Sequence, residues 1–389
     1  MKKTMFIGLS LFLMFFNCGA DVDVQTVEIP ENIIENVFEL EMTFGDKDEL
    51  GDFLLANPML MAVANNGDII VPDDRYLKIF NKNGEPKKIV GDPGQGPGEF
   101  SKQIVNILIA DNGYITATSD VRFRTFNIFT PDYSFVEMIR FENNPLIKKL
   151  SAEAIDRRFH VESVYSYGPD EFLVNAVWAS KTDESTAAFY HIQNGKSSLI
   201  KEFKVKVEKN TLQIFEYYLL SNKRILYIDP VLFKEKIGDD WYYILHIHDL
   251  KTHETTQIER QYVPVRIPDS LMVYKEPKFP PNVSERLKNN IIKSEKENIE
   301  ELKKKKVYDP IRKVFTDNDL IFVVTNIKVP GKGYVVEIID ADSGEYLHSA
   351  FFDFFPPIIK NGYAYRLMSG GNIFPYVEKY RINPAVYGK

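Results

Sequence analysis

The chain has very little cysteine and no excess of positive charge. Cys18 is the single cysteine among 389 residues, so no disulfide can form within the chain. The formal net charge is −7, which leaves no electrostatic basis for binding nucleic acid. Beyond the N-terminus, no segment is apolar enough to span a bilayer. Stability must therefore come from a hydrophobic core, for which 28 phenylalanines and 21 tyrosines supply large side chains that favour strands.

The sequence also lacks the short motifs of common catalytic centres. It contains no Gly-x-Ser-x-Gly elbow, no His-Glu-x-x-His run and no paired-cysteine motif. Among the six histidines, His246 and His248 are two apart on a predicted strand and point to the same face, which makes them weak candidates for a metal pair. No third ligand stands at a recognisable spacing, because Asp249 points the other way. We therefore predict no catalytic residue and no metal site from motifs alone.

The N-terminus has the pattern of an export signal. Lys2 and Lys3 precede the apolar run Met5–Phe16, which has the length of a secretory signal and is too short for a spanning helix. Cys18 follows this run directly, so we predict a lipoprotein signal peptide over residues 1–17 and acylation of Cys18. Residues 18–32 are then an acidic tether that leads into the first strand.

The match to a lipoprotein signal is imperfect. Phe15 and Asn17 stand where the pattern has leucine and a small residue, whereas Gly19 fits. Two alternatives stay open for Cys18: a cleaved, soluble export signal that happens to end near it, or a buried free thiol.

Residues 60–100 show a repeated order of strand, turn and loop. The segment Asn66–Asp73 is a short apolar strand that follows a turn and ends in aspartate, and Ile79–Glu85 is a second strand that runs into an Asn-Gly turn. A glycine- and proline-rich loop, Gly91–Phe100, then leads onward. This loop is not followed by Lys-Ser or Lys-Thr, so it lacks the parts of a phosphate cradle. The order resembles NHL-type repeats and, more closely, the six-bladed β-propeller lipoproteins of Gram-negative bacteria.

The turns repeat through the rest of the chain at intervals of roughly 45–55 residues, with one gap about twice as long. Six turns of Asn, Asp, Gly or Ser each precede a β-rich strand, and they lie at 65–67, 111–113, 167–170, 221–223, 317–319 and 361–362. Five further turns fall between the expected outer strands, at 83–84, 131–132, 194–195, 251–253 and 343–344. We predict an all-β fold over residues 33–389: a six-bladed β-propeller of four-stranded antiparallel blades.

The sixth outer turn is missing, because the chain ends after the predicted strand Pro375–Ile382. Residues 38–44 alternate strictly between apolar and polar side chains, which is typical of a strand with one solvated face. We predict that this N-terminal strand completes blade six and closes the ring, which would remove free sheet edges. The alternative is an independent N-terminal hairpin.

The long gap, between blades four and five, predicts one helical insertion at about 281–307. Ser284 can cap a helix from Glu285 to about Lys306, and the lysines 303–306 suit the negative end of its dipole. These lysines suggest either a basic patch for phospholipid or polysaccharide, or a solvated helix end. The solvated end is the simpler interpretation.

In a propeller, the loops that join the second strand to the third gather with the blade-to-blade loops around one mouth of the channel. This arrangement gives a candidate binding face that contains Asp73, Asp74, Arg75, Arg122 and Trp178. Trp178 is either an exposed platform for a sugar ring or peptide side chain, or a residue packed between blades. The helical insertion belongs to a blade-to-blade loop and is expected over the same face.

Three functions are compatible with these patterns. The resemblance favours a membrane-anchored lipoprotein of the Gram-negative envelope, on its periplasmic side or at the cell surface. Its propeller would bind a glycan, a peptide or an envelope protein. The second is a hydrolase or lyase that holds Ca²⁺ or Zn²⁺ in the channel, because oxygens from six inner strands can converge on a cation. The third is a sensor or assembly factor whose helical insertion docks a partner.

Overall fold

The computed structural model describes residues 32–120, 125–140, 144–153, 159–179, 184–206, 217–229, 234–237, 240–280, 283–369 and 374–388. The predicted signal peptide, Cys18 and most of the tether therefore lie outside the described residues. The chain divides into two compact units. The larger unit contains residues 29–264 and 309–389, and the described part of the smaller unit lies within 265–308.

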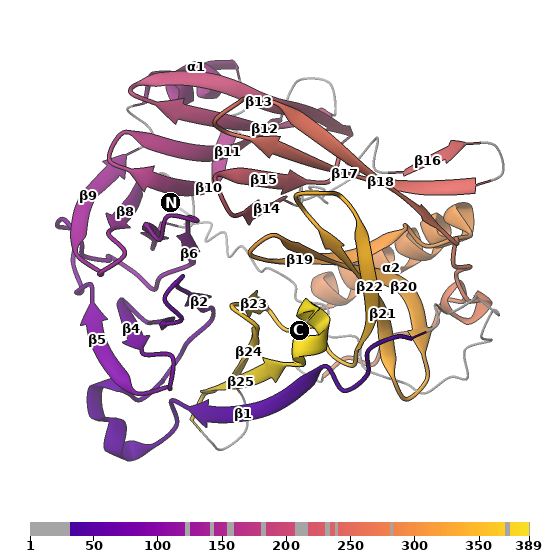
Figure 1. The fold of residues 1–389 in the computed structure, drawn as a ribbon, viewed down its shortest axis with the longest axis horizontal. Coiled ribbons are helices and arrows are strands. Elements are labelled where there is room, and N and C mark those ends of the chain that lie inside the picture. Colours follow the sequence, from indigo (N-terminus) through magenta and orange to yellow (C-terminus); the bar gives the residue numbers. More distant parts are fainter. Residues whose placement is uncertain are drawn as a thin grey trace. The chain divides into compact units, whose positions relative to one another are not determined.

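The larger unit is a propeller of six antiparallel sheets, which confirms the predicted fold (Figure 1). Each blade has four strand positions, counted from the inside of the ring outward. The first strands are β2 (Ala62–Val63), β6 (Asn106–Ile109), β10 (Phe159–Gly168), β14 (Tyr217–Leu220), β19 (Ile311–Asp317) and β23 (Ile358–Lys360). The second are β3 (Ile69–Asp73), β7 (Ile115–Thr118), β11 (Glu171–Ala179), β15 (Arg224–Tyr227) with β16 (Lys234–Ile237), β20 (Leu320–Val329) and β24 (Tyr363–Met368).

The third strands are β4 (Tyr76–Phe80), β8 (Thr125–Phe129), β12 (Glu184–Gln193), β17 (Asp240–Asp249), β21 (Gly333–Asp340) and β25 (Tyr376–Ile382). The outer strands are β5 (Pro86–Val90), β9 (Phe135–Arg140), β13 (Lys196–Lys206), β18 (Thr255–Tyr262), β22 (Tyr346–Phe352) and β1 (Phe38–Phe44). All six predicted inner turns and all five predicted outer turns fall between the expected strands.

The turns form because their residues tolerate backbone conformations that other residues avoid. In the first turn of blade one, the Gly67 N–H donates to the Ala64 carbonyl at 2.9 Å, and Gly67 has a φ of +87°. In blade six, Asn361 takes a φ of +55° at the equivalent place. Positive φ is unfavourable for most residues and readily adopted by glycine and asparagine. The glycine and asparagine residues therefore help to determine where these two hairpins turn.

The hydrophobic core lies between neighbouring blades. Large aromatic side chains that are at most 1% exposed fill these interfaces, among them Phe80, Phe129, Phe189, Phe322 and Phe352. They come from the third and outer strands as well as from the second, so each blade presents apolar side chains to both neighbours. Because no blade can cover its own two faces, the sheets are stable only when the ring is complete.

The strand β1 closes the ring. It pairs antiparallel with β25, and Phe38 lies opposite Ile382 while Phe44 lies opposite Val377. The N-terminal strand is therefore part of blade six, as predicted, and the independent hairpin is the wrong alternative. On the same pair of strands, the Lys379 Nζ donates to Glu41 at 2.8 Å. Burial alone would raise the pKa of Glu41, but the hydrogen bonds from Lys379 and Arg381 outweigh it and hold that pKa below its usual value.

Blade four departs from the regular pattern because its second strand is broken. The outer strand β18 pairs with β17 from Trp241 to His248 along one edge of β17. The other edge is shared, since β15 pairs with the end of β17 and β16 pairs with its beginning. The sheet thus has five strands at four positions, and the sequence pattern did not reveal the break.

A short helix that the sequence analysis did not predict connects blades two and three. The helix α1 (Pro145–Glu153) follows Asn144, whose side chain accepts the Leu146 N–H at 2.9 Å. Proline suits the first position of a helix, where its missing N–H costs nothing. Ile147 is 3% exposed and packs with the core between these blades, so tertiary packing stabilises this single short helix.

The smaller unit contains the predicted insertion helix, α2 (Glu285–Lys305). Ser284 caps it and accepts the Leu287 N–H at 3.4 Å, as expected from the sequence. No residue of α2 is buried, and three of the lysines lie in its last turn. Within this unit, the Ile267 N–H donates to the Lys306 carbonyl, so the two ends of the insertion lie together. Its expected place over the mouth of the propeller stays a prediction.

Among the described residues, no helix combines the length and the apolar character needed to cross a membrane.

Replacing Phe44 tests whether β1 completes the propeller. Phe44 is 6% exposed, and its ring lies 5.0 Å from that of Phe80, so we expect Phe44→Ala to lower the free energy of unfolding by about 3–5 kcal/mol. Leu40 lies on the same strand but is 51% exposed, so Leu40→Ala should change it by only about 0.5 kcal/mol. Urea unfolding of both variants measures this, and equal effects would contradict the closure by β1.

Candidate functional site

Asp73 belonged to the predicted binding face, but the structure buries it. Its side chain is 3% exposed and accepts a hydrogen bond from the Lys78 Nζ at 2.7 Å. It also accepts the backbone N–H groups of Ala56 and Asn57, at 3.0 and 2.7 Å. Lys78 donates in turn to the Leu54 carbonyl at 2.6 Å. This ion pair therefore holds the loop that precedes β2 against the end of β3, and Asp73 serves the fold.

Of the other residues of the predicted face, the structure describes Asp74, Arg75 and Trp178. The side chains of Asp74 and Arg75 are 59% and 39% exposed and form a weak surface pair at 3.4 Å. Trp178 is 8% exposed and packs with Ala176, Ala188 and Tyr190 of its own blade, so it is not an exposed platform. Arg122 lies outside the described residues. Asp74 and Arg75 remain available at the surface, and their role in binding stays a prediction.

The two candidate metal-binding histidines lie on β17 and are both buried, at 4% and 5% exposure. His246 stacks on the Tyr227 ring, with ring centres 5.0 Å apart and planes at 8°. The His248 Nδ1 lies 2.9 Å from the Thr255 hydroxyl. Among the described residues, no group of three or more His, Cys, Asp or Glu side chains is arranged to hold a metal ion.

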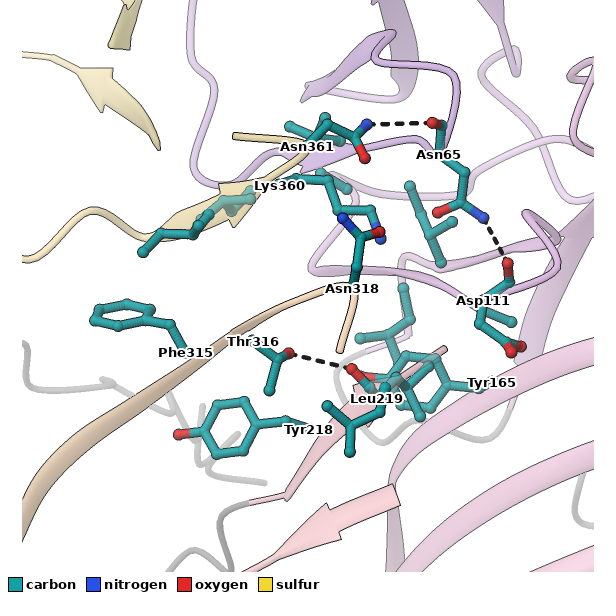
Figure 2. Close-up of a pocket in the computed structure, with 18 of the residues that line it drawn as sticks. Asn65, Asp111, Tyr165, Tyr218, Leu219, Phe315, Thr316, Asn318, Lys360 and Asn361 are labelled. Atoms are coloured by element: carbon teal, nitrogen blue, oxygen red, sulfur yellow. Dashed lines mark hydrogen bonds between the residues drawn. The ribbon is translucent and has the colours of Figure 1, made fainter. Parts of the chain in front are cut away.

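The propeller unit contains a cavity of about 610 Å³ along its centre. All six first strands contribute to its wall, and it lies at the end where the first turns of the blades meet. The middle of the wall is apolar, with Val63, Ile107, Leu108 and Leu219 among its residues. Polar side chains of the turns line its end, and Figure 2 shows Asn65, Asp111, Asn318, Lys360 and Asn361 there.

The turns at this end are linked by hydrogen bonds from each blade to the next, and we call this set the turn ring. Its bonds are Asn65 Nδ2 to Asp111 O (2.7 Å), Asn112 Nδ2 to Tyr167 O (2.8 Å), Lys223 Nζ to the Glu171 carboxylate (2.7 Å), Arg224 to Asp319 (2.5 Å), Asn361 N to Asp317 (2.7 Å) and Asn361 Nδ2 to Asn65 O (3.1 Å). The turn ring thus passes through all six blades and supports the end of the cavity.

The turn ring also determines which polar atoms the cavity offers. The amide nitrogens of Asn65 and Asn361 donate within the ring, so their oxygens remain as acceptors. One oxygen of Asp111 accepts the Lys223 N–H at 2.6 Å, and the other is buried without a hydrogen bond among the described residues. Lys360 adds a cationic group to the lining. A ligand here would meet acceptors, one cation and an apolar wall, which suits a molecule with both polar and apolar parts.

The binding face predicted from the sequence lies at the end of the channel opposite the turn ring. The second strand of each blade runs from the first turn to the loop before the third strand, so these two sets of connections lie at opposite ends. The residues at the end of the cavity were visible in the sequence as the Asn and Asp of the predicted turns. In the sequence these residues are typical turn formers, and no local pattern indicates that they meet across the ring.

No protein-family model matches the sequence, and no curated protein matches it. Several solved structures are similar in fold. A predicted exported protein from Bacteroides fragilis is 15% identical with a TM-score of 0.42, and the match covers 91% of this chain and 98% of that one. The β-propeller domain of the trilobed protease from Pyrococcus furiosus is 9% identical with a TM-score of 0.35, over 83% and 82% of the two chains. Such likenesses carry no argument about activity.

The neighbours Asp73 and Asp74 allow a matched test of the structural role of Asp73. Asp73→Asn removes the charge that faces the buried ammonium of Lys78, so we expect the free energy of unfolding to fall by about 3 kcal/mol. Asp74→Asn should change it by less than about 1 kcal/mol, because Asp74 is exposed and asparagine tolerates its φ of +55°. Chemical denaturation of both variants is the measurement, and an Asp73→Asn variant as stable as the parent would contradict this role.

Proposed function

We propose that this protein is an exported lipoprotein whose propeller binds a ligand in its central cavity. The cavity carries the proposal, because all six blades contribute to its wall and polar groups line one end. The export pattern of residues 1–17 and the resemblance to envelope lipoproteins support the location. The protein would act as a binding or scaffolding component of the Gram-negative envelope, held at a membrane by the acylated Cys18.

The chemistry of the cavity supports a ligand rich in hydrogen-bonding groups. The amide oxygens of Asn65 and Asn361 can accept hydrogen bonds from a ligand, and Lys360 can donate them. Both the hydroxyls of a glycan and the amides of a peptide or protein loop have this character. An apolar group of the same ligand would cover the wall formed by residues such as Leu108 and Leu219. The exposed pair Asp74 and Arg75, at the opposite end of the channel, would offer a second contact surface.

Filling the cavity tests the binding proposal. Leu108 is half-buried in the cavity wall, so Leu108→Trp should occupy part of the space and weaken binding by about tenfold or more. Leu347, 43% exposed on the outer strand β22, provides the control Leu347→Trp, which should bind like the parent.

Arrays of envelope glycans and of peptides, probed with the purified mature protein, provide the ligands and distinguish the two classes. Binding that survives Leu108→Trp unchanged would place the ligand elsewhere, and an absence of binding on both arrays would contradict the proposal.

Replacing Cys18 tests the membrane anchor. Each buried methylene of an acyl chain contributes about 0.8 kcal/mol, so a multiply acylated protein should sediment with membranes. We expect Cys18→Ser to remain in the soluble envelope fraction and to lose incorporation of labelled palmitate. A Cys18→Ser protein that still sediments with membranes would contradict the anchor without affecting the fold.

A further inference from the structure

Four of the six histidines meet at one interface, between blades three and four. His191 lies on β12 of blade three, while His246 and His248 lie on β17 of blade four and His253 in the turn that follows. The His253 ring centre is 6.0 Å from that of His191 and 6.3 Å from that of His248. We call these four residues the histidine seam.

The seam is continuous with the apolar core between the same blades. Tyr227, on which His246 stacks, packs with Phe189 and Phe203 of blade three. Phe189 lies two residues before His191 on β12, so both side chains point toward blade four. Polar rings that can acquire charge therefore sit beside side chains that exclude water.

The charged groups around the two buried rings offer little compensation for added charge. His246 is near Asp229, which already pairs with Lys201 at 3.6 Å, and its Nδ1 lies 3.4 Å from the Gln257 amide. Around His248 stand Thr255 and Asp249, together with two further histidines of the seam.

The Nε2 atoms of His246 and His248 are buried and have no hydrogen-bond partner among the described residues. A protonated imidazole needs an acceptor at both nitrogens, so charging either ring inside the closed seam leaves a buried N–H unpaired. Burial lowers the pKa of both rings, and it outweighs Asp229 near His246 and Asp249 near His248, which act in the opposite direction. For His248, the neighbouring His253 and His191 lower the pKa further. The closed seam thus favours the neutral rings.

A chain of contacts leads from the seam to the cavity. The His191 Nε2 lies 3.0 Å from a Glu171 oxygen, and Glu171 accepts hydrogen bonds from the Lys223 Nζ at 2.7 Å. The backbone N–H of Lys223 donates to Asp111 at 2.6 Å, and Asp111 lines the cavity. Lys223 also belongs to the turn between β14 and β15, and β14 forms part of the cavity wall.

We propose that the histidine seam is an acid-operated switch, which loosens the contact between blades three and four and thereby reshapes the cavity when its rings gain protons. The step is the transfer of a proton from a hydronium ion to the unprotonated nitrogen of each ring, which is Nδ1 of His246, facing the Gln257 amide N–H, and Nε2 of His248, with no other covalent bond formed or broken. The effect on a ligand rests on the proposed function, whereas the opening of the seam does not.

The lowered pKa values of His246 and His248 determine how the stability of the seam depends on pH. In the unfolded or opened protein, the histidine rings take up protons near about pH 6.5. In the closed seam, the same rings take up protons only at lower pH. The stability that the seam gains from its neutral rings is therefore complete above about pH 6.5 and is lost as pH falls toward the lowered values. The transition belongs to mildly acidic conditions.

Hydrogen exchange of the mature protein at pH 7.5 and pH 5.0 tests the switch, after correction for the intrinsic rate at each pH. We expect exchange in β12, β17 and the wall strand β14 to rise about tenfold or more at pH 5.0, because rings that take up protons near about pH 6.5 once opened stabilise the opened form at pH 5.0. The strands of blade one, β3 and β4, should change little and serve as the internal reference.

Two sets of variants assign the effect to the rings. His246→Phe keeps the stacking on Tyr227, and His248→Gln keeps a polar group toward Thr255, so the double variant should fold and lose most of the acid response. His348 bonds the Val386 carbonyl at 3.0 Å, away from the seam, so His348→Gln should retain the full response.

An equal acid response in the double variant and the parent would overturn the switch, as would a parent whose seam exchanges no faster at pH 5.0. Neither readout uses a ligand, so failure of the proposed function leaves this test intact. If β12 and β17 loosen while β14 does not, the coupling of the seam to the cavity is overturned.

Discussion

Every blade of this propeller depends on its two neighbours, because the apolar side chains of its sheet point outward on both faces. A single four-stranded sheet would leave both faces in water, and only a closed ring covers them all. Two separate sets of contacts close the ring of blades. The strand β1 completes blade six from the opposite end of the chain, and the turn ring joins the first turns of all six blades by hydrogen bonds.

The same closure creates the cavity. The first strand of each blade has its partner on one side only, so the centre of the ring is bounded by six strand edges and the turns that follow them. The turn ring uses the amide nitrogens of Asn65 and Asn361 for its own bonds and leaves oxygens toward the space. Stability and binding chemistry thus come from the same side chains, which is why a polar site can exist here without separate binding loops.

The six interfaces between blades are not equivalent. The contact between blades five and six combines Phe322, Phe352 and Val336 with the buried Asp317. The contact between blades three and four adds four histidines, Glu171 and Lys223 to an aromatic core. Histidines take up protons under mildly acidic conditions, so the contact that holds four of them is the one proposed to respond to mild acid. Its connection to Asp111 places that response beside the cavity.

The sequence by itself determined the architecture: six blades, the closing strand at 38–44 and the capped helix after Ser284. These features depend on local properties, namely turn residues that accept positive φ, the period of two along a strand, and a capping side chain. The break between β15 and β16 and the helix α1 were missed, because pairing along β17 and packing around Ile147 decide them.

Tertiary structure alone decided the candidate site. Asp73 and Trp178 resemble surface loop residues in sequence, and only their partners show that they are buried. Lys223 and Asp111 are 112 positions apart, and Asn361 and Asn65 are 296 apart, yet each pair is joined by a hydrogen bond at the same end of the cavity. Which turn residues meet, and which histidines face one another, follows from the closing of the ring, and no local pattern contains that information.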